Sequence, residues 1–365
     1  MLDHFWWGSL FLLGVPVMLL LVITGPLLLP EYRIPEAGML DLTSVLLSLG
    51  AILPVIYGLK EIAKHGLQIA PLLFILAGAV LGALFVSRQR KLTSPLLDLR
   101  LFASPGFSAA LGGMFGITLT GATMLFVAQY LQFVQGMSPF KAGLCMLPGV
   151  MASMAGMILS PLIARRIRPA LLIGTGLLIS AAGCLLLTQV GAQSGLMILF
   201  IGYIFFNVGA TPLPSLSSDL VIGSAPPEKA GSAASLLQTS GEFAFALGIA
   251  ILGSIGTVVY RSQVADSIPT GLPASAVQSS RDSLAGAVTV AEGLPGQIGT
   301  ALLTGAREAF TGGMHAVAVA SGVIVLGVII LVVTQLRHIR PIGETPSTQA
   351  DRIPEPVPVA AMESS

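Results

Sequence analysis

Hydrophobic residues gather along this chain into long runs, and most polar residues lie between them. Runs of about 20 residues are typical of helices that cross the hydrocarbon core of a bilayer. A membrane β-barrel would instead require segments of about ten residues with alternating apolar and polar positions. The pattern therefore predicts an all-α multi-span membrane protein with about nine transmembrane helices. The runs cover residues 5–29, 42–59, 69–87, 107–132, 142–163, 170–190, 195–219, 231–259 and 309–336.

One carboxylate interrupts the run at residues 231–259. Glu242 lies near its middle, and a helix places Ser235 and Gln238 on the same face as this acid. A charge at the centre of a bilayer costs at least ~2.5 kcal/mol on insertion scales, so such an acid is a functional candidate by default. The alternative is a protonated acid that bonds to Gln238 or to a neighbouring helix and holds helices together.

Other candidate residues lie in three of the runs. They are Gln129, Tyr130, Gln132 and Gln135 in one run, Asn207, Thr211 and Ser215 in a second, and Phe243 and Phe245 beside Glu242. The first group either lines a solute path or forms an aromatic and amide belt at the membrane interface. The second forms a polar stripe on a helix that Pro212 and Pro214 loosen. The aromatic rings are weaker candidates, for cation–π contacts, because such rings more often pack against neighbouring helices.

Composition supports a membrane protein and excludes several other functions. Charged residues make up 10% of the chain and hydrophobic residues 54%, whereas a soluble domain has about 25% charged residues. The net charge of +1 argues against a nucleic-acid partner. The sequence contains no phosphate-binding loop, and no catalytic or metal-binding constellation lies within the runs. We therefore expect neither an enzyme nor a metal site, and we expect no cofactor other than a coupling proton.

The distribution of Lys and Arg predicts the orientation in the cell membrane. Twelve of the 18 basic residues follow the odd-numbered runs, so those loops are expected to face the cytoplasm. The C-terminus would then be cytoplasmic and the N-terminus outside. The long loop at 261–308 would lie outside, with short amphipathic helices at 274–290 and 295–310 that cover the outer face. The tail at 337–365 is predicted to be disordered and cytoplasmic.

Four segments together resemble one family, the fourteen-span drug:proton antiporters of the major facilitator superfamily, of the QacA/EmrB type. They are HFWWGSLFLLGVPV (4–17), AQYLQFVQGMSPFKAGLCMLP (128–148), SDLVIGSAPPEKAGSAASLLQTSGEF (218–243) and ALGIAILGSIGTVVYR (246–261). The resemblance implies a division into the last helix of an amino lobe (1–30), two central extra spans (42–87), a cytoplasmic basic linker (88–106) and a six-helix carboxyl lobe (107–336).

The resemblance also implies a function, the efflux of hydrophobic or cationic drugs in exchange for protons. Glu242 falls where the family commonly carries acids for protonation or for cation recognition. Some members have another acid about one turn earlier, where this chain has Leu237 and Gln238, and this difference weakens the case for dicationic substrates. The expected partners are the lipid bilayer, protons and small hydrophobic or cationic molecules.

Five spans that precede Met1 in the family have no counterpart in this sequence. The chain is therefore expected to be the carboxyl-terminal nine spans of a transporter, from a truncated gene, a late start or a split gene. A separately encoded amino-terminal half would be a partner in the last case. Two alternatives stay open: a dedicated exporter of one metabolite or antibiotic, and a membrane subunit that does not itself transport.

The predicted orientation can be tested by cysteine labelling in intact cells. In a background without Cys145 and Cys184, Arg90→Cys should resist a membrane-impermeant maleimide because residue 90 would face the cytoplasm. Ser279→Cys should react, because residue 279 would lie outside. The reverse labelling pattern would overturn the orientation.

Overall fold

The computed structural model describes most of the chain as helices. The described residues are 12, 14–28, 41–65, 68–92, 102–192, 195–223, 230–269 and 272–336, and every regular element in these ranges is helical. Seven of their helical segments are long and apolar enough to cross a membrane: Ile69–Gln89, Pro105–Val134, Pro139–Ala164, Pro169–Leu187, Leu196–Val221, Ala230–Ser267 and Gly296–Leu336. An all-α multi-span protein is confirmed, and the two other predicted spans coincide with shorter apolar helices, Gly14–Gly25 and Leu42–Gly58.

The chain divides into two compact units, Met1–Leu40 and Asp41–Ser365. The first contains α2 (Gly14–Leu28), whose described side chains, apart from Thr24, are apolar and largely exposed. The second begins with α3 (Leu42–His65) and α4 (Ile69–Gln89), which pack together as a hairpin. The predicted tail at 337–365 lies outside the described residues.

Small residues and one ion pair hold the α3–α4 hairpin together. A Cβ atom at Gly78 would lie 2.7 Å from the carbonyl oxygen of Ala51, so the two backbones are almost in contact. At one end of the hairpin the Asp41 carboxylate accepts hydrogen bonds from Nε (2.9 Å) and Nη2 (3.0 Å) of Arg88 and from the Ser44 hydroxyl. These bonds, above all those from Arg88, hold the pKa of the Asp41 carboxyl well below its usual range.

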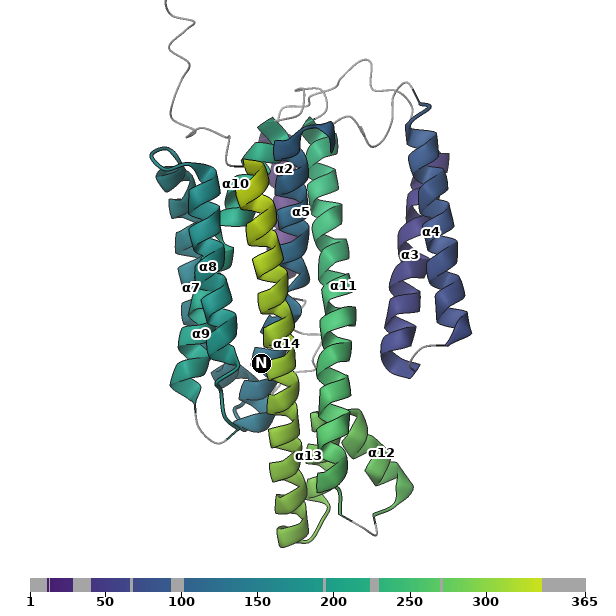
Figure 1. Cartoon of the computed structure of the whole chain (residues 1–365), viewed down its shortest axis with the longest axis vertical. Coiled ribbons are helices and arrows are strands. Elements are labelled where there is room, and N and C mark those ends of the chain that lie inside the picture. The colour runs from purple at the N-terminus through teal and green to yellow at the C-terminus, as the bar shows by residue number, and fades with distance from the viewer. Residues whose placement is uncertain are drawn as a thin grey trace, which may run out of the picture. The chain divides into compact units, whose positions relative to one another are not determined.

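The remaining helices form a bundle (Figure 1). In chain order they are α5 (Pro105–Leu119), α6 (Ala122–Gln129), η2 (Tyr130–Val134), α7 (Pro139–Ala164), α8 (Pro169–Leu187), α9 (Leu196–Ala210), α10 (Pro212–Gly223), α11 (Ala230–Val264), η4 (Ala265–Ser267), α12 (Ala274–Asp282), α13 (Leu284–Glu292) and α14 (Gly296–Leu336). The long helices α11 and α14 pack against each other and against α5, and α14 also packs against α8.

The run predicted at 107–132 is interrupted in the structure. Helix α5 ends at Leu119, α6 starts after Gly121, and η2 is a π-helical turn. A Cβ atom at Gly121 would lie 2.8 Å from the ring of Phe245, so glycine allows α11 to approach the backbone where the helix breaks. Pro212 likewise separates α9 from α10, because proline lacks the N–H that would continue the ladder of hydrogen bonds. The loosening expected at Pro212 is thus confirmed.

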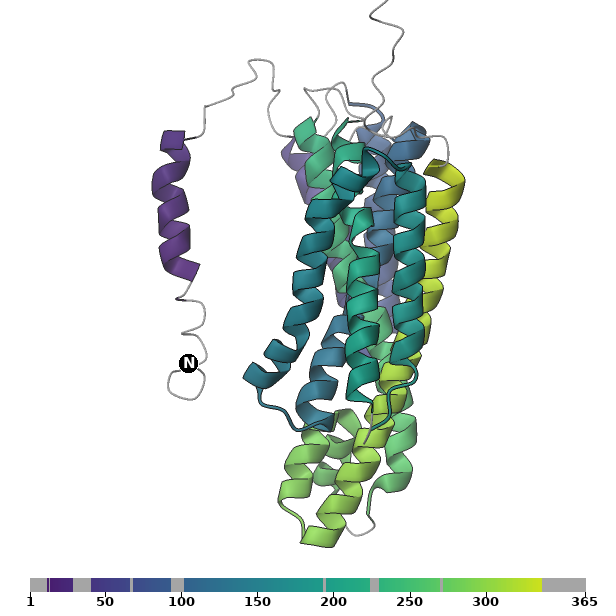
Figure 2. The ribbon, with the colours of Figure 1, turned by 90° about the vertical axis from the view of Figure 1, so that its left-hand side faces the viewer.

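Helices α11 and α14 extend beyond their neighbours at one end (Figures 1 and 2). They contain 35 and 41 residues, which correspond to about 52 and 62 Å, whereas a hydrocarbon core is about 30 Å thick. Helices α12 and α13, which we call the cap (residues 274–292), pack beside the protruding turns. The expectation of a separate short helix at 295–310 is wrong, because these residues continue without a break into the long helix α14.

One face of α11 is buried against the bundle. Its buried residues recur about every four positions: Ala233, Leu237, Ala244, Gly248, Leu252, Gly256, Tyr260 and Val264. The closest approach is at Gly248, where a Cβ atom would overlap the carbonyl oxygen of Leu119 at the end of α5. This contact fixes the rotation of α11 about its own axis, so the opposite face must point away from the bundle.

The packing at Gly248 gives a prediction about stability. Gly248→Ala should lower the free energy of unfolding by about 1–3 kcal/mol because the added methyl group forces α11 away from α5. The control is Gly241→Ala on the same helix, where a Cβ atom would meet no neighbour within 4 Å; it should be neutral or stabilising by up to about 1 kcal/mol. The melting temperature of each variant can be measured by heating the detergent-solubilised protein with a maleimide dye, which labels the buried Cys184 thiol when the protein unfolds. Equal melting temperatures for the two variants would contradict the close approach.

Candidate functional site

The exposed face of α11 carries the acid singled out in the sequence. Ser235, Gln238 and Glu242 are all exposed and lie opposite the buried face. Gln238 Nε2 donates a hydrogen bond of 3.0 Å to Glu242 Oε1, and the Ser235 hydroxyl donates to the Ser232 carbonyl at 2.9 Å. The shared face follows from the spacing in the sequence, whereas a bond between Gln238 and Glu242 was expected under the structural alternative. This bond joins two residues of one helix, so it does not act between helices.

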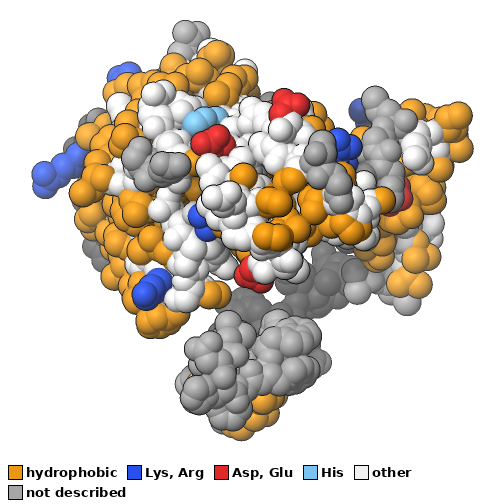
Figure 3. All heavy atoms as spheres, turned by 90° about the horizontal axis from the view of Figure 1, so that it is seen from below, with side chains coloured by type: hydrophobic (Ala, Val, Ile, Leu, Met, Phe, Trp, Pro, Cys, Tyr) orange, Lys and Arg blue, Asp and Glu red, His pale blue; other side chains and the backbone are white. Residues whose placement is uncertain are grey.

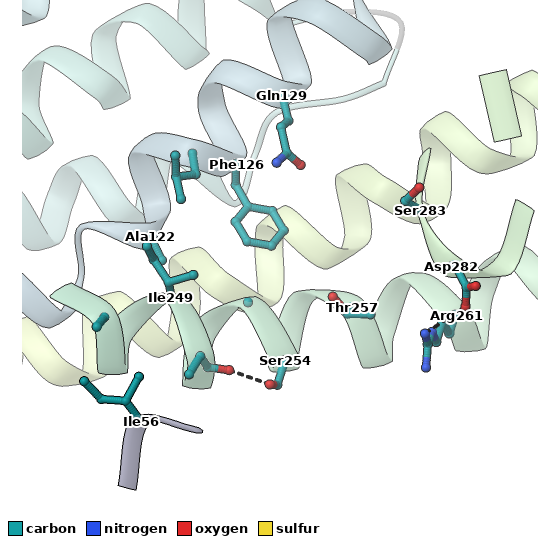
Figure 4. A pocket seen from close by; sticks show the side chains of 14 residues that line it. Ile56, Ala122, Phe126, Gln129, Ile249, Ser254, Thr257, Arg261, Asp282 and Ser283 are labelled. Atoms are coloured by element: carbon teal, nitrogen blue, oxygen red, sulfur yellow. Dashed lines mark hydrogen bonds and ion pairs between the residues drawn. The ribbon is translucent and has the colours of Figure 1, made fainter. Parts of the chain in front are cut away.

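The same face of α11 continues into a groove. Ala246, Ile249 and Gly253 follow Glu242 at four, seven and eleven residues, which places them on its side of the helix. They line a groove of about 640 Å³ between α6 and α11 (Figure 4). Other lining residues are Ile56 of α3, Ala122, Leu125, Phe126 and Gln129 of α6, Ala250, Ser254, Thr257 and Arg261 of α11, and Asp282 and Ser283 at the cap. The groove thus begins one turn beyond Glu242 and ends at the cap.

The groove combines apolar walls with a few polar groups. Figure 4 shows Phe126 and Gln129 projecting from α6 toward the helix that carries Ile249 and Thr257. The Ser254 hydroxyl donates to the Ala250 carbonyl of its own helix. Small-molecule sites are commonly concave and mainly apolar, with a small number of polar groups that orient the ligand. The arrangement therefore suits an amphiphilic ligand with a flat or bulky apolar part.

The structure separates the members of the glutamine row. Gln129 lines the groove, whereas Gln132 lines a second cavity of about 440 Å³ on the side facing α13 and α14. Gln135 Nε2 donates to the Tyr130 hydroxyl (2.8 Å) and to the Ala192 carbonyl (3.3 Å). Each glutamine thus has a different environment, because the π-helical turn η2 changes the rotation per residue within the row.

Tyr130 lies in the core of the bundle. Its side chain is fully buried, and its hydroxyl donates a hydrogen bond of 2.6 Å to the Gly191 carbonyl. The preceding carbonyl, that of Val190, accepts a hydrogen bond of 2.8 Å from His315 Nε2. Tyr130 therefore anchors the connection between α8 and α9, and the structure does not bring it to the groove with Gln129.

The polar stripe on α9 and α10 bonds mainly to backbone groups. Asn207 Nδ2 donates to the Tyr203 carbonyl of its own helix at 2.8 Å. The Ser215 hydroxyl donates to the Met157 carbonyl of α7 at 3.1 Å. Because Pro161 cannot donate the N–H that would normally reach the Met157 carbonyl, Ser215 satisfies an acceptor that would otherwise be unpaired. Ser215 of the stripe thus joins α10 to α7. Asn207, at the other end of the stripe, is half-buried.

Two aromatic residues of α11 flank Glu242. Phe243 is half-buried, and its ring centre lies 6.1 Å from that of Phe115 on α5. Phe245 is more exposed and covers Gly121 at the break between α5 and α6. Phe243 therefore packs within the bundle, whereas Phe245 keeps part of its ring accessible on the side of α11 that bears the groove.

Sequence reasoning missed the residues at the far end of the groove. Arg261 Nη2 and Asp282 Oδ1 form an ion pair at 2.9 Å that joins α11 to the cap. In the sequence, the only indication of the groove wall on α11 was the helical spacing that places Ala246, Ile249 and Gly253 on the same face as Glu242. The ion pair had no signal, because its partners are separated by a turn and a second helix.

Comparisons with known proteins agree on one family. The Major Facilitator Superfamily model matches residues 1–249. The chain is 36% identical over 327 residues to the "Multidrug efflux pump LfrA" of Mycolicibacterium smegmatis, covering 89% of this chain and 64% of that protein. It is 34% identical over 336 residues to the "Methyl viologen resistance protein SmvA" of Salmonella typhimurium, covering 88% of this chain and 65% of that protein.

A third relative is a Streptomyces protein named for resistance and export. The chain is 29% identical over 341 residues to the "Tetracenomycin C resistance and export protein" of Streptomyces glaucescens, covering 89% of this chain and 62% of that protein. The chain thus spans slightly less than two thirds of the length of these relatives. The family model nevertheless covers more than half of the chain, and its apolar helices are those of a multi-span membrane protein. The chain belongs to the major facilitator superfamily.

Proposed function

We propose that the chain serves in the efflux of hydrophobic organic cations across the cell membrane in exchange for protons. The observation that carries this proposal is the position of Glu242. Its carboxylate lies on the exposed face of α11, and that face continues directly into the groove between α6 and α11. A negative charge at the entrance to a largely apolar groove matches a ligand with a positive charge and an apolar body.

The Glu242 carboxylate can hold either a proton or a cation, but not both. In its ionised form it attracts a cationic ligand, while the Gln238 amide donates to one of its oxygens at 3.0 Å. A proton that binds the carboxylate removes the negative charge and weakens its hold on the cation. An inward-moving proton gains about 2.3 kcal/mol per 100 mV of membrane potential, so this competition would couple proton entry to cation release. No cofactor is needed for this cycle.

The groove supplies the contacts for the rest of the ligand. Ile249, Leu125 and the ring of Phe126 offer apolar surface, and the Gln129 amide offers a donor and an acceptor. Phe245 keeps 38% of its surface exposed and is available for a cation–π contact. One relative is named for resistance to methyl viologen, an organic dication, and this name supports a cationic substrate class, although this chain has Leu237 and Gln238 where some family members carry a second acid. Another is named a multidrug efflux pump, which supports efflux without indicating the charge of the substrate.

A dedicated exporter of one compound is the second candidate function. It is favoured by the relative named as a tetracenomycin C export protein. The two functions differ in the breadth of ligands that bind, since a dedicated exporter would accept one scaffold only. In either case the cap and the groove end would face outward, and the bundle at 107–336 would act as the carboxyl lobe beside the two central spans at 42–87.

The proposal predicts the effect of Glu242→Gln on cation binding. The full chain in lipid nanodiscs should bind tetraphenylphosphonium, and the binding should weaken as the pH is lowered because a proton competes for the carboxylate. Glu242→Gln should weaken binding about tenfold at neutral pH, which corresponds to about 1.4 kcal/mol, and should remove the pH dependence. Equilibrium dialysis with labelled tetraphenylphosphonium measures both effects.

The control for this experiment is Glu308→Gln. Glu308 is an exposed acid on α14 that does not line the groove, so its loss should leave affinity and pH dependence unchanged. Glu242→Gln with the affinity and pH profile of the unmodified chain would assign the acid a purely structural role. Binding of several unrelated cations would favour the multidrug function over a dedicated exporter.

A further inference from the structure

The groove has an acid near each of its ends, and the two acids are held in the same way. Gln238 Nε2 donates to Glu242 Oε1 at 3.0 Å, and Gln278 Nε2 donates to Asp282 Oδ1 at 3.0 Å. In each case the glutamine precedes the acid by four residues on its helix. The difference is Arg261, whose Nη2 lies 2.9 Å from Asp282 Oδ1. Asp282 therefore has a built-in cationic partner.

The ion pair lies where the groove meets the cap. Arg261 and Asp282 both line the groove, and their side chains are 42% and 45% exposed. Figure 3, which views the molecule from the end that bears the cap, shows a few charged side chains scattered among hydrophobic and other surface atoms. A ligand that moves along the groove away from Glu242 therefore passes from apolar walls to this pair at the end of the groove.

The pair is not what holds the cap in place. Exposed ion pairs contribute little to stability because water and salt screen them. The cap is anchored instead by the Tyr260 hydroxyl, which donates to the Ser280 carbonyl at 2.8 Å in a buried position, and by the buried side chains of Leu284 and Ala287. Asp282 can thus exchange Arg261 for another cation without loss of the fold around it.

We propose that Asp282 is a second, transient binding site for hydrophobic organic cations, and that Arg261 competes with the ligand for it. This inference rests on the proposed function, because it supplies the step after release from Glu242. When a cation reaches the groove end, the carboxylate exchanges one positive partner for another, and water solvates the released Arg261 side chain, which is 42% exposed. The return of Arg261 then displaces the ligand. The pair would repel anionic ligands less strongly than an unpaired Asp282 would. It would also attract them less strongly than an unpaired Arg261 would.

The proposal predicts opposite effects for the two halves of the pair. Arg261→Gln leaves Asp282 without its competitor, so the full chain in nanodiscs should bind tetraphenylphosphonium about fivefold more tightly at low salt. Asp282→Asn leaves Arg261 unpaired, so tetraphenylphosphonium should bind more weakly by a similar factor. Tetraphenylborate, an anion of the same shape, should respond in the opposite sense to each substitution. The effects should shrink at 0.3 M salt, where the charges are screened.

Two controls make the result specific to this pair. Arg281→Gln removes the exposed arginine next to Asp282 that does not line the groove, and it should change neither affinity. The double variant Arg261→Gln/Asp282→Asn should bind both ions with an affinity between those of the single variants. Melting temperatures measured with the maleimide dye should stay within a few degrees of the unmodified chain, as expected for an exposed pair.

The outcomes separate this inference from the proposed function. If tetraphenylphosphonium binding depends on Glu242 but is unchanged by Arg261→Gln and Asp282→Asn, the inference is overturned and the proposed function stands. If binding responds to the pair but not to Glu242→Gln, the site at Asp282 stands and the role proposed for Glu242 fails. A response to Arg281→Gln equal to that of Arg261→Gln would also overturn the inference, because general surface charge would then explain it.

Discussion

The need to satisfy backbone hydrogen bonds in a medium without water governs the rest of this structure. Continuous helices satisfy these backbone hydrogen bonds within themselves. The bundle, however, also contains a break at Gly121, a π-helical turn and several prolines. Side chains compensate at these places: Thr120 donates to the Ile117 carbonyl at 2.6 Å, and Ser215 donates to the Met157 carbonyl that Pro161 leaves without a donor. Many polar side chains of the bundle are therefore bound to its own backbone and are not available to a ligand.

Glu242 differs from these residues because an ionised carboxylate accepts hydrogen bonds and cannot donate to a free carbonyl. It has the Gln238 amide as a partner on its own helix, and it lies on the face of α11 opposite the contact between Gly248 and Leu119. The close approach on one side of the helix thus determines what the other side exposes. The orientation of α11 about its own axis therefore accounts both for the packing at Gly248 and for the exposure of Glu242.

Family membership and local geometry support different parts of the functional argument. The superfamily and the names of the relatives favour transport of small molecules, but they do not indicate which residues meet the ligand. We propose that the ligand binds in the groove between α6 and α11, which has an acid close to one end and the Asp282–Arg261 pair at the other. An isolated acid binds a cation, whereas an acid with its own arginine binds a cation only in competition. In the proposed mechanism, these two acids, one near each end of the groove, give ligand release its direction.

The sequence by itself determined the helical class, the positions of most helices and the shared face of Gln238 and Glu242, because run length and the 3.6-residue period are local properties. Only the tertiary structure decided which polar residues are accessible. Gln129 and Tyr130 are adjacent in sequence, yet one lines the groove and the other is fully buried, since successive helical residues point about 100° apart and packing selects the buried side. The ring of Phe245 packs at Gly121, where the helix breaks, and the Arg261–Asp282 pair joins two helices through residues 21 positions apart. Such contacts depend on how helices are placed against one another, and no local pattern encodes that placement.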